Sequence, residues 1–399
     1  MVQGRIMKKI QLWPQEPLLK DGLLELAATV EKYDGENWRL WFRLPGDTSP
    51  ALTGNADPFV LAVLFHAMEI PADLEIHGEV SPSLVRNLEE FQKAWALWRP
   101  EKYHPVEITA SSMREQSPLH RKEVAMGFSG GVDSAFTAWQ YRSGMQNLPG
   151  GQLTTGIMVH GYDIPIDQPD IFARAAEKAR LMLASIGMDL ITISTNIRAL
   201  GSDWSDSHGA VLAASMLFFQ KRFNTGLIAS SYPYNDLVIP YGSSPLTDRL
   251  LTNDTFLIVH HGATHDRVEK IRQISQWAEA RQYLRVCWSG SLLDRNCCRC
   301  LKCVTAMLIF RAVGQGSLPS FPADISDRDI LRMKYNDIRS MRRYIRLLSA
   351  QAFTASTIRA MEMSFRINKL RLAAMKIPRV NKLIRRLEYR WFLDPDLAY

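Results

Sequence analysis

The sequence predicts an α/β protein with a parallel sheet at its centre, and three observations carry this prediction. From residue 123 to about 318, strand-like and helix-like segments alternate, as they do in parallel sheets covered by helices. A glycine pair lies between the first of these strands and the next helix, and all five cysteines fall between residues 287 and 303. We therefore divide the 399 residues into an N-terminal α+β domain (1–115), a central domain (116–320) and a C-terminal helical region (321–399).

The glycine pair forms the turn of a strand–loop–helix segment, VAMGFSGGVDSAFTAWQY. Residues 124–128 suit a buried strand, and residues 135–141 have the apolar spacing of a helix. Gly130 and Gly131 permit positive φ and leave backbone N–H groups open toward a ligand. With the helix N-terminus, these groups favour a phosphate-type anion, and Asp133 adds a carboxylate for Mg²⁺ or a substrate hydroxyl.

The loop SGGVDS resembles the SGGxDS signature of the PP-loop ATP pyrophosphatases at all six positions. The resemblance implies a domain that binds MgATP, cleaves it between the α and β phosphates, releases pyrophosphate and leaves AMP on the substrate. An ordinary glycine turn is the alternative. The nucleotide-binding residues that the resemblance implies are Ser129, Gly130, Gly131, Val132, Asp133 and Ser134.

The strands that follow the loop end in polar residues. We expect strands at 154–160, 189–195 and 226–231, with helices at 169–186 and 206–222 between them. Ligands of such sheets lie beyond the carboxyl ends of the strands. The residues at these ends are His160, a candidate nucleotide ligand, and Asn196, Ser230 and Ser231.

A basic segment, VHHGATHDRVEKI, supplies further candidates for the phosphates. Thr264 or Asp266 can cap a helix on which Arg267 and Lys270 share one face. Two such cations beside the glycine loop would stabilise departing pyrophosphate, and we assign them, with Asp133, to catalysis. An exposed helix with a solvated charged face is the alternative.

The cysteine cluster has the spacing of a metal site. Cys297, Cys300 and Cys303 form a C-x2-C-x2-C run, and Cys287 precedes it by ten residues. Four thiolates close a tetrahedral zinc site without an open position, so we expect a structural zinc knuckle (287–303) rather than a catalytic metal. Cys298 is surplus to this site, and a group of free buried thiols is the alternative.

Together, the loop and the cysteines resemble the 7-cyano-7-deazaguanine synthase family over about residues 123–312. The resemblance implies adenylation of a carboxylate, followed by attack of ammonia or another amine. It also implies the four zinc ligands, whereas Cys298 stands where that family often has glycine. Residues 230–233 are not followed by the run of residues with which that family recognises its substrate. The resemblance therefore supports the same activation chemistry more strongly than it supports the same substrate.

The sequence of the N-terminal domain predicts strands and helices in the order β-β-α-β-α-β. Two strands flank a turn at Asp34-Gly35, while Asp57 and Ser81, each followed by proline, are expected N-caps of two helices. We interpret the domain as a recognition or assembly module, with a structural appendage as the alternative. The expected strands are 23–31, 38–44, about 74–77 and about 106–109.

The C-terminal region carries the basic character of the chain. Its 17 Lys and Arg against 8 Asp and Glu give it a charge of +9, whereas the whole chain has +7. We expect two or three basic helices, including MRRYIRLL (341–348), with a break at Pro378. Such helices bind nucleic acid, an acidic protein or an anionic membrane surface, or else pack on the central domain through their apolar faces.

The apolar runs are too short for a membrane span, and residues 1–15 lack the apolar segment of a signal peptide, so we expect a cytoplasmic protein. The leading prediction is an ATP-dependent ligase that forms AMP and pyrophosphate and makes a C–N bond, in a monomer or an oligomer. One rival is a PP-loop tRNA sulfurtransferase, which needs a reactive cysteine or an iron–sulfur cluster. The other is a non-catalytic nucleotide-binding subunit of a biosynthetic or defence complex.

Overall fold

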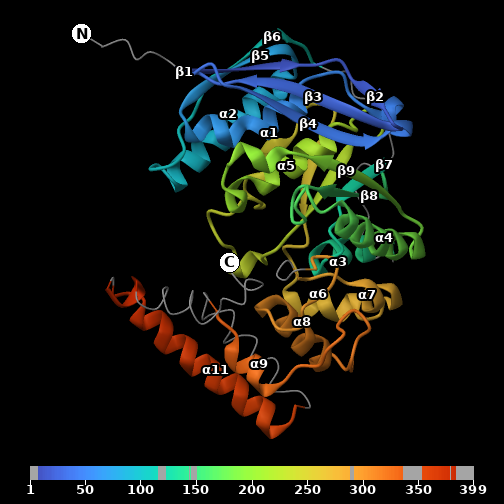
Figure 1. The fold of residues 1–399 in the computed structure, drawn as a ribbon, viewed down its shortest axis with the longest axis vertical. Coiled ribbons are helices and arrows are strands. Elements are labelled where there is room, and N and C mark those ends of the chain that lie inside the picture. The colour runs from blue at the N-terminus through green and yellow to red at the C-terminus, as the bar shows by residue number, and fades with distance from the viewer. Residues whose placement is uncertain are drawn as a thin grey trace. The chain divides into compact units, whose positions relative to one another are not determined.

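The computed structural model describes residues 8–115, 123–142, 144, 151–287, 292–335, 353–377 and 379–382. It is an α/β protein with one sheet of 11 strands, mostly parallel, which confirms the predicted fold class at this level (Figure 1). The chain divides into two compact units. The first consists of Met1–Ser129, Thr137–Pro169 and Leu183–His265, and the second of Gly130–Phe136, Asp170–Met182 and Asp266–Tyr399.

All the described strands belong to the first unit, and their order in the sheet differs from their order in the chain. From one edge to the other the order is β11-β10-β7-β8-β9-β4-β3-β1-β5-β6, and β2 pairs with β3. The strands are β1 Lys8–Pro14, β2 Leu18–Lys20, β3 Leu23–Glu31, β4 Asn37–Pro45, β5 Ala72–Val80, β6 Ile108–Met113, β7 Glu123–Gly127, β8 Gln152–His160, β9 Asp189–Thr195, β10 Thr225–Ala229 and β11 Leu257–His261.

The helices are shared between the two units. Three lie in the first unit, five described helices lie in the second, and two contribute residues to both. The first unit holds α1 Asp57–Glu69, α2 Pro82–Trp98 and α5 Trp204–Leu217. The second holds α6 Arg267–Ile274, α7 Ala278–Tyr283, α8 Leu301–Ala312, α9 Asp327–Arg332 and α11 Ala355–Ala374, and the shared helices are α3 Val132–Arg142 and α4 Pro169–Ser185.

Five parallel strands, four of them predicted, form the part of the sheet that lies in the predicted central domain. If they are numbered in chain order from β7, their spatial order is 3-2-1-4-5, because β8 and β9 lie on one side of β7 and β10 and β11 on the other. The order reverses between β7 and β10, and ligands of doubly wound sheets bind at such a switch point. The glycine loop follows β7 at this point. β11 was not predicted as a strand.

The N-terminal strands continue the same sheet. β4 joins β9 in antiparallel register through two residue pairs. Asn196 reinforces this junction, since its Oδ1 accepts from the Trp41 N–H at 3.0 Å and its Nδ2 donates to the Arg39 carbonyl at 2.8 Å. Thr195 Oγ1 donates to the Trp41 carbonyl at 2.8 Å. Asn196, a candidate ligand by its place after β9, therefore holds two strands together.

The predicted order of elements in the N-terminal domain is confirmed, and two strands, β1 and β2, are additional to it. β3 matches its predicted bounds, and β4, α1, β5, α2 and β6 follow as expected. β1 was missed, although it lies between β3, to which it is antiparallel, and β5, to which it is parallel. The three-domain division of the sequence stays a prediction.

The prediction that Asp57 caps α1 is wrong. Ala56 is the N-cap and Asp57 is the first helical residue, with its carboxylate buried. This carboxylate accepts hydrogen bonds from the Ser81 N–H (2.9 Å), the Ser81 hydroxyl (2.6 Å) and the amides of Asn253 (2.7 Å) and Asn55 (3.2 Å). Burial raises the pKa of Asp57. The hydrogen bonds favour the charged carboxylate and oppose this shift without cancelling it. Ser81 is the N-cap of α2 as predicted, but its hydroxyl serves Asp57 instead of the helix.

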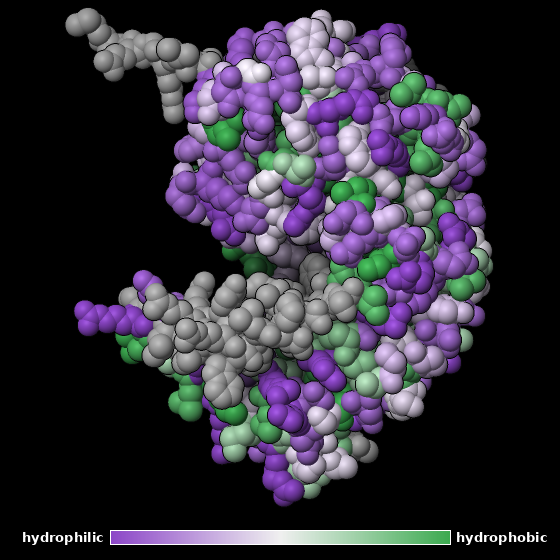
Figure 2. Space-filling model, in the orientation of Figure 1, coloured by the Kyte–Doolittle hydropathy of each residue, from purple (hydrophilic) through white to green (hydrophobic). Residues whose placement is uncertain are grey.

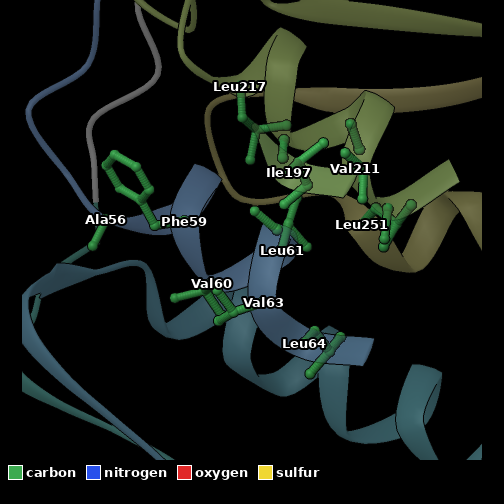
Figure 3. Close-up of a cluster of buried hydrophobic side chains, with 14 of the residues drawn as sticks. Ala56, Phe59, Val60, Leu61, Val63, Leu64, Ile197, Val211, Leu217 and Leu251 are labelled. Atoms are coloured by element: carbon green, nitrogen blue, oxygen red, sulfur yellow. The ribbon is translucent and has the colours of Figure 1, made fainter. Parts of the chain in front are cut away.

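The core of the first unit lies between α1, α5 and the sheet. Figure 3 shows Phe59 and Leu61 of α1 beside Val211 and Leu217 of α5, and all four side chains are at most 5% exposed. α1 is apolar around most of its circumference, as expected of a helix enclosed on all sides. Figure 1 shows α1, α2 and α5 together beneath strands β3 and β4.

The visible surface is mostly hydrophilic, with apolar side chains scattered in small groups (Figure 2). Among the helices that the structure describes, none combines the length and the apolarity needed to cross a membrane. The predicted basic tail does contain helices, α9 and α11, whereas residues 341–348 and Pro378 lie outside the described residues. Binding of nucleic acid, an acidic protein or a membrane surface by the tail stays a prediction.

Three histidines of the first unit should make its stability pH-dependent. Burial lowers the pKa of His66, His160 and His208 below 6.5, so each stays neutral when folded. Their contribution to stability is complete above pH 6.5 and is lost as the pH falls through the folded-state values, because the unfolded chain then binds more protons. We expect the urea midpoint to fall between pH 7.5 and pH 5.5. His208→Asn should flatten this slope, and an equal slope in the variant would contradict the assignment.

Candidate functional site

The glycine loop joins β7 to α3 with one left-handed residue. Gly130 has a φ of 74°, and a side chain there would be strained, although the space around it is open. The left-handed conformation does not extend to Gly131, contrary to the expectation for both glycines. α3 begins at Val132, three residues earlier than predicted, so Asp133 and Ser134 lie in its first turn. The Ser134 hydroxyl donates to the Gly131 carbonyl at 3.2 Å.

Asp133 contacts both predicted cations of α6, more than 130 residues further along the chain. Its Oδ1 lies 3.0 Å from the Lys270 ammonium, and its Oδ2 lies 3.1 Å from the Arg267 guanidinium. Lys270 is almost completely buried (2% exposed), whereas Arg267 and Asp133 are 29% and 20% exposed. The three residues predicted for catalysis therefore meet in the second unit, beside the loop.

The first turn of α6 is built to hold these cations. Asp266, one of the two predicted candidates, is the N-cap of α6. It also forms a capping box with Glu269. Asp266 Oδ1 accepts from the Val268 and Glu269 N–H groups at 2.8 and 2.9 Å. These carboxylates offset the unfavourable placement of Arg267 and Lys270 near a helix N-terminus.

The charges of the site alter each other's proton affinity. Burial alone would raise the pKa of Asp133. The positive charges of Arg267 and Lys270, with a smaller contribution from Lys302, outweigh burial and hold this pKa below its usual value. Burial lowers the pKa of Lys270, and Asp133 offsets this only in part. Asp133 is therefore an anion at neutral pH.

Other predicted ligands have internal hydrogen bonds within the first unit. The His160 ring is buried and its Nε2 lies 2.8 Å from the Pro165 carbonyl. The Ser230 hydroxyl donates to the Tyr232 carbonyl at 2.7 Å. Ser129, also in this unit, is exposed at the start of the glycine loop. The assignment of His160 and Ser129 to the nucleotide stays a prediction.

The four predicted zinc ligands converge. Their sulfur atoms all lie within 4.8 Å of one another. The Cys287–Cys300 sulfur distance is 3.7 Å, and the Cys297–Cys303 distance is 3.9 Å. Sulfurs bound 2.3 Å from a tetrahedral zinc are about 3.8 Å apart, whereas a disulfide requires about 2.05 Å. The group can therefore hold a metal such as zinc with little rearrangement.

Cys298 lies outside this group and has an unusual backbone conformation. Its φ is 61°, a left-handed conformation that glycine adopts without strain. Its side chain is 2% exposed, and burial raises the pKa of its thiol. Such a thiol is a poor nucleophile.

Comparison of the chain with protein-family models, curated proteins and solved structures finds no match. The site is therefore interpreted from its own chemistry.

Sequence reasoning missed three residues that link the cysteines to the loop. The Arg285 N–H donates to the Gly130 carbonyl at 2.9 Å, and Asn296 binds the Val286 N–H at 2.9 Å. Lys302, between two of the candidate metal ligands, contributes to the lowered pKa of Asp133. The only available signal was the position of Lys302 inside the cysteine run, because the other two contacts depend on backbone geometry.

Proposed function

We propose that the protein is an ATP-dependent ligase that activates a carboxylate or amide oxygen as its adenylate and passes the acyl group to ammonia or another amine. The observation that carries the proposal is the meeting of Asp133, Arg267 and Lys270 beside a left-handed glycine turn. A glycine loop, a helix N-terminus and two neighbouring cations together favour a polyphosphate.

In the proposed reaction, a substrate oxygen attacks the α phosphorus of ATP, and the bond to the bridging oxygen of the β phosphate breaks. Pyrophosphate leaves with that electron pair. The amine then attacks the acyl carbon, AMP leaves, and the amine proton passes to solvent. Loop N–H groups would position the phosphates, while Arg267 and Lys270 would stabilise the negative charge that develops on pyrophosphate.

Asp133 is the residue that fits Mg²⁺. It supplies a carboxylate oxygen, the ligand type that Mg²⁺ prefers, and a bound Mg²⁺ would neutralise phosphate charge. In the structure Asp133 pairs with Arg267 and Lys270. We infer that nucleotide binding transfers these two cations to the phosphates and leaves Asp133 for the metal.

The cysteines distinguish this proposal from its sulfurtransferase rival. Four of the five form the metal group, and the fifth, Cys298, is buried with a raised pKa. Cys298 therefore does not supply the accessible thiolate that one route of sulfur transfer needs. The other route, through an iron–sulfur cluster, predicts iron instead of zinc in the purified protein, which metal analysis measures. Structural zinc, by contrast, is compatible with ligation chemistry.

The test is incubation of the full chain with ATP, Mg²⁺ and a panel of carboxylic acids and amines, with AMP and pyrophosphate measured by chromatography. We expect both products in equal amounts. Formation of ADP and orthophosphate would contradict the proposal. ATP binding without any turnover across the panel would favour the non-catalytic subunit instead.

A further inference from the structure

A buried aspartate of the second unit holds three cations close together. Asp294 is 2% exposed and lies just before the C-x2-C-x2-C run. Its Oδ2 accepts from the Nε of Arg174 on α4 at 2.9 Å. Lys178, one turn further along α4, donates to the Asp294 carbonyl at 2.7 Å, and the Arg295 Nε lies 3.7 Å from the Asp294 Oδ1. One carboxylate therefore anchors three positive side chains from two segments of the chain.

The charge balance around this cluster is positive. Residues 170–182 and 284–303 contain seven Lys or Arg and three Asp or Glu, an excess of four. A zinc ion bound by four thiolates would add two negative charges and leave an excess of two. On α4, the carboxylate of Glu177 is paired with Arg180 at 2.6 Å. Among the residues that the structure describes, Asp294 is the only carboxylate paired with any of the three cations.

The cations of the cluster repel one another. Burial is the largest cause of the lowered pKa of Lys178, and Asp294 offsets part of it. Arg174, Arg285 and Arg295 lower this pKa further, because a like charge disfavours the protonated ammonium. Arg285 is itself buried, and its Nη1 donates to the carbonyl of the residue before Asp294 at 3.2 Å. A bound oxyanion would relieve this repulsion.

Two of the three cations keep donors for such an anion. A guanidinium has five N–H donors, whereas Arg174 is engaged through Nε and Arg295 through its 3.7 Å ion pair. Their side chains are 47% and 54% exposed. We propose that Arg174, Lys178 and Arg295 form an oxyanion site that binds a terminal phosphate group, as inorganic phosphate or as a phosphate monoester. This site shares no residue with the glycine-loop site.

The charge and the shape of a terminal phosphate both match the cluster. A phosphate monoester carries about two negative charges at neutral pH, which equals the excess of three cations over one carboxylate. Its three terminal oxygens can accept from the planar guanidinium groups in pairs and from the ammonium as a single contact. A carboxylate has one charge and two oxygens, so it would leave part of the cluster without a partner.

The Nε–Hε signals of arginine in NMR spectra test the proposal at the site itself. We expect the signals of Arg174 and Arg295, assigned by their loss in Arg174→Gln and Arg295→Gln, to shift with inorganic phosphate and with phenyl phosphate. Arg295→Gln should raise the midpoint concentration of the Arg174 shift about tenfold, since one charge-assisted contact is lost. This variant should fold, because Arg295 is exposed and its ion pair is long.

Arg180→Gln is the matched control, because Arg180 lies on α4, is 50% exposed and is paired with Glu177 instead of Asp294. It should leave the midpoint unchanged. The proposal is overturned if phosphate shifts the two signals no more than the same concentration of acetate does. It is also overturned if Arg180→Gln weakens binding as much as Arg295→Gln.

A phosphate diester separates a terminal phosphate from a nucleic-acid backbone. Dimethyl phosphate, with one negative charge, should bind at least about tenfold more weakly than phenyl phosphate. Equal binding of the diester would assign the cluster to a nucleic-acid backbone and would overturn the proposal. Tighter binding of phenyl phosphate than of inorganic phosphate would support an ester as the ligand, and the reverse order would support free phosphate. None of these results depends on whether the glycine loop binds ATP.

Discussion

Asp133→Asn should lower the rate of AMP and pyrophosphate formation by about 10²–10³-fold. The substitution keeps the size of the side chain but removes the charge that a Mg²⁺ ion would contact. It also removes the carboxylate shared by Arg267 and Lys270, which leaves the site more positive. Without Mg²⁺, we therefore expect the variant to bind ATP at least as tightly as the parent protein does. Steady-state assays and calorimetry measure the two effects separately.

The same variant should be less stable. Lys270 is 2% exposed, and weakening its ion pair with a partly buried carboxylate should cost about 1–3 kcal/mol of the free energy of unfolding. Asp189→Asn is the control, because Asp189 is exposed and lies at the amino end of β9, opposite to the ligand-binding edge. Turnover by Asp133→Asn within threefold of the control would exclude Asp133 from the reaction.

Cys300→Ser should lose its zinc and melt at least about 10 °C below the parent protein. Removal of one ligand opens a site whose binding free energy contributes to folding of the second unit. Metal content by mass spectrometry and thermal unfolding by circular dichroism measure both effects. Chelation of zinc from the parent protein should produce the same shift in melting temperature.

The neighbouring cysteine provides the control for this experiment. Cys298→Gly should keep about one zinc per chain, since Cys298 is outside the four-sulfur group and its φ of 61° suits glycine. The relief of backbone strain should offset part of the lost burial. Loss of zinc from Cys298→Gly as complete as from Cys300→Ser would show that the ligand set is different.

Local signals explain what the sequence could predict. The alternating pattern around Asp34-Gly35 gave β3 with its observed bounds, because a hairpin pairs residues that are close in the chain. The three-residue spacing of Arg267 and Lys270 on one helix led to the two cations that contact Asp133, and the C-x2-C-x2-C run led to three of the four cysteines that converge. In each case, the interaction depends on residues whose spacing is set by one local element.

Non-local pairing explains most of what was missed. β1 has only a short apolar alternation and ends at Pro14, and its partner β5 is some 60 residues away, so nothing nearby identifies it as a central strand. Asp57 was expected to cap α1, but its buried carboxylate accepts a hydrogen bond from Asn253, which lies far away in the sequence. The ion pairs of Asp133 require α3 and α6 to meet, and sequence spacing alone does not fix that distance.

The junction between β4 and β9 has a consequence for how the protein can be dissected. A truncated chain that begins at residue 116 would lack β4 and would leave the backbone groups of β9 unpaired along one side. The unpaired N–H and C=O groups of an exposed edge strand can form hydrogen bonds with strands of other molecules. A fragment without the N-terminal domain should therefore aggregate, even though every residue to which we assign a role in the proposed reaction would still be present.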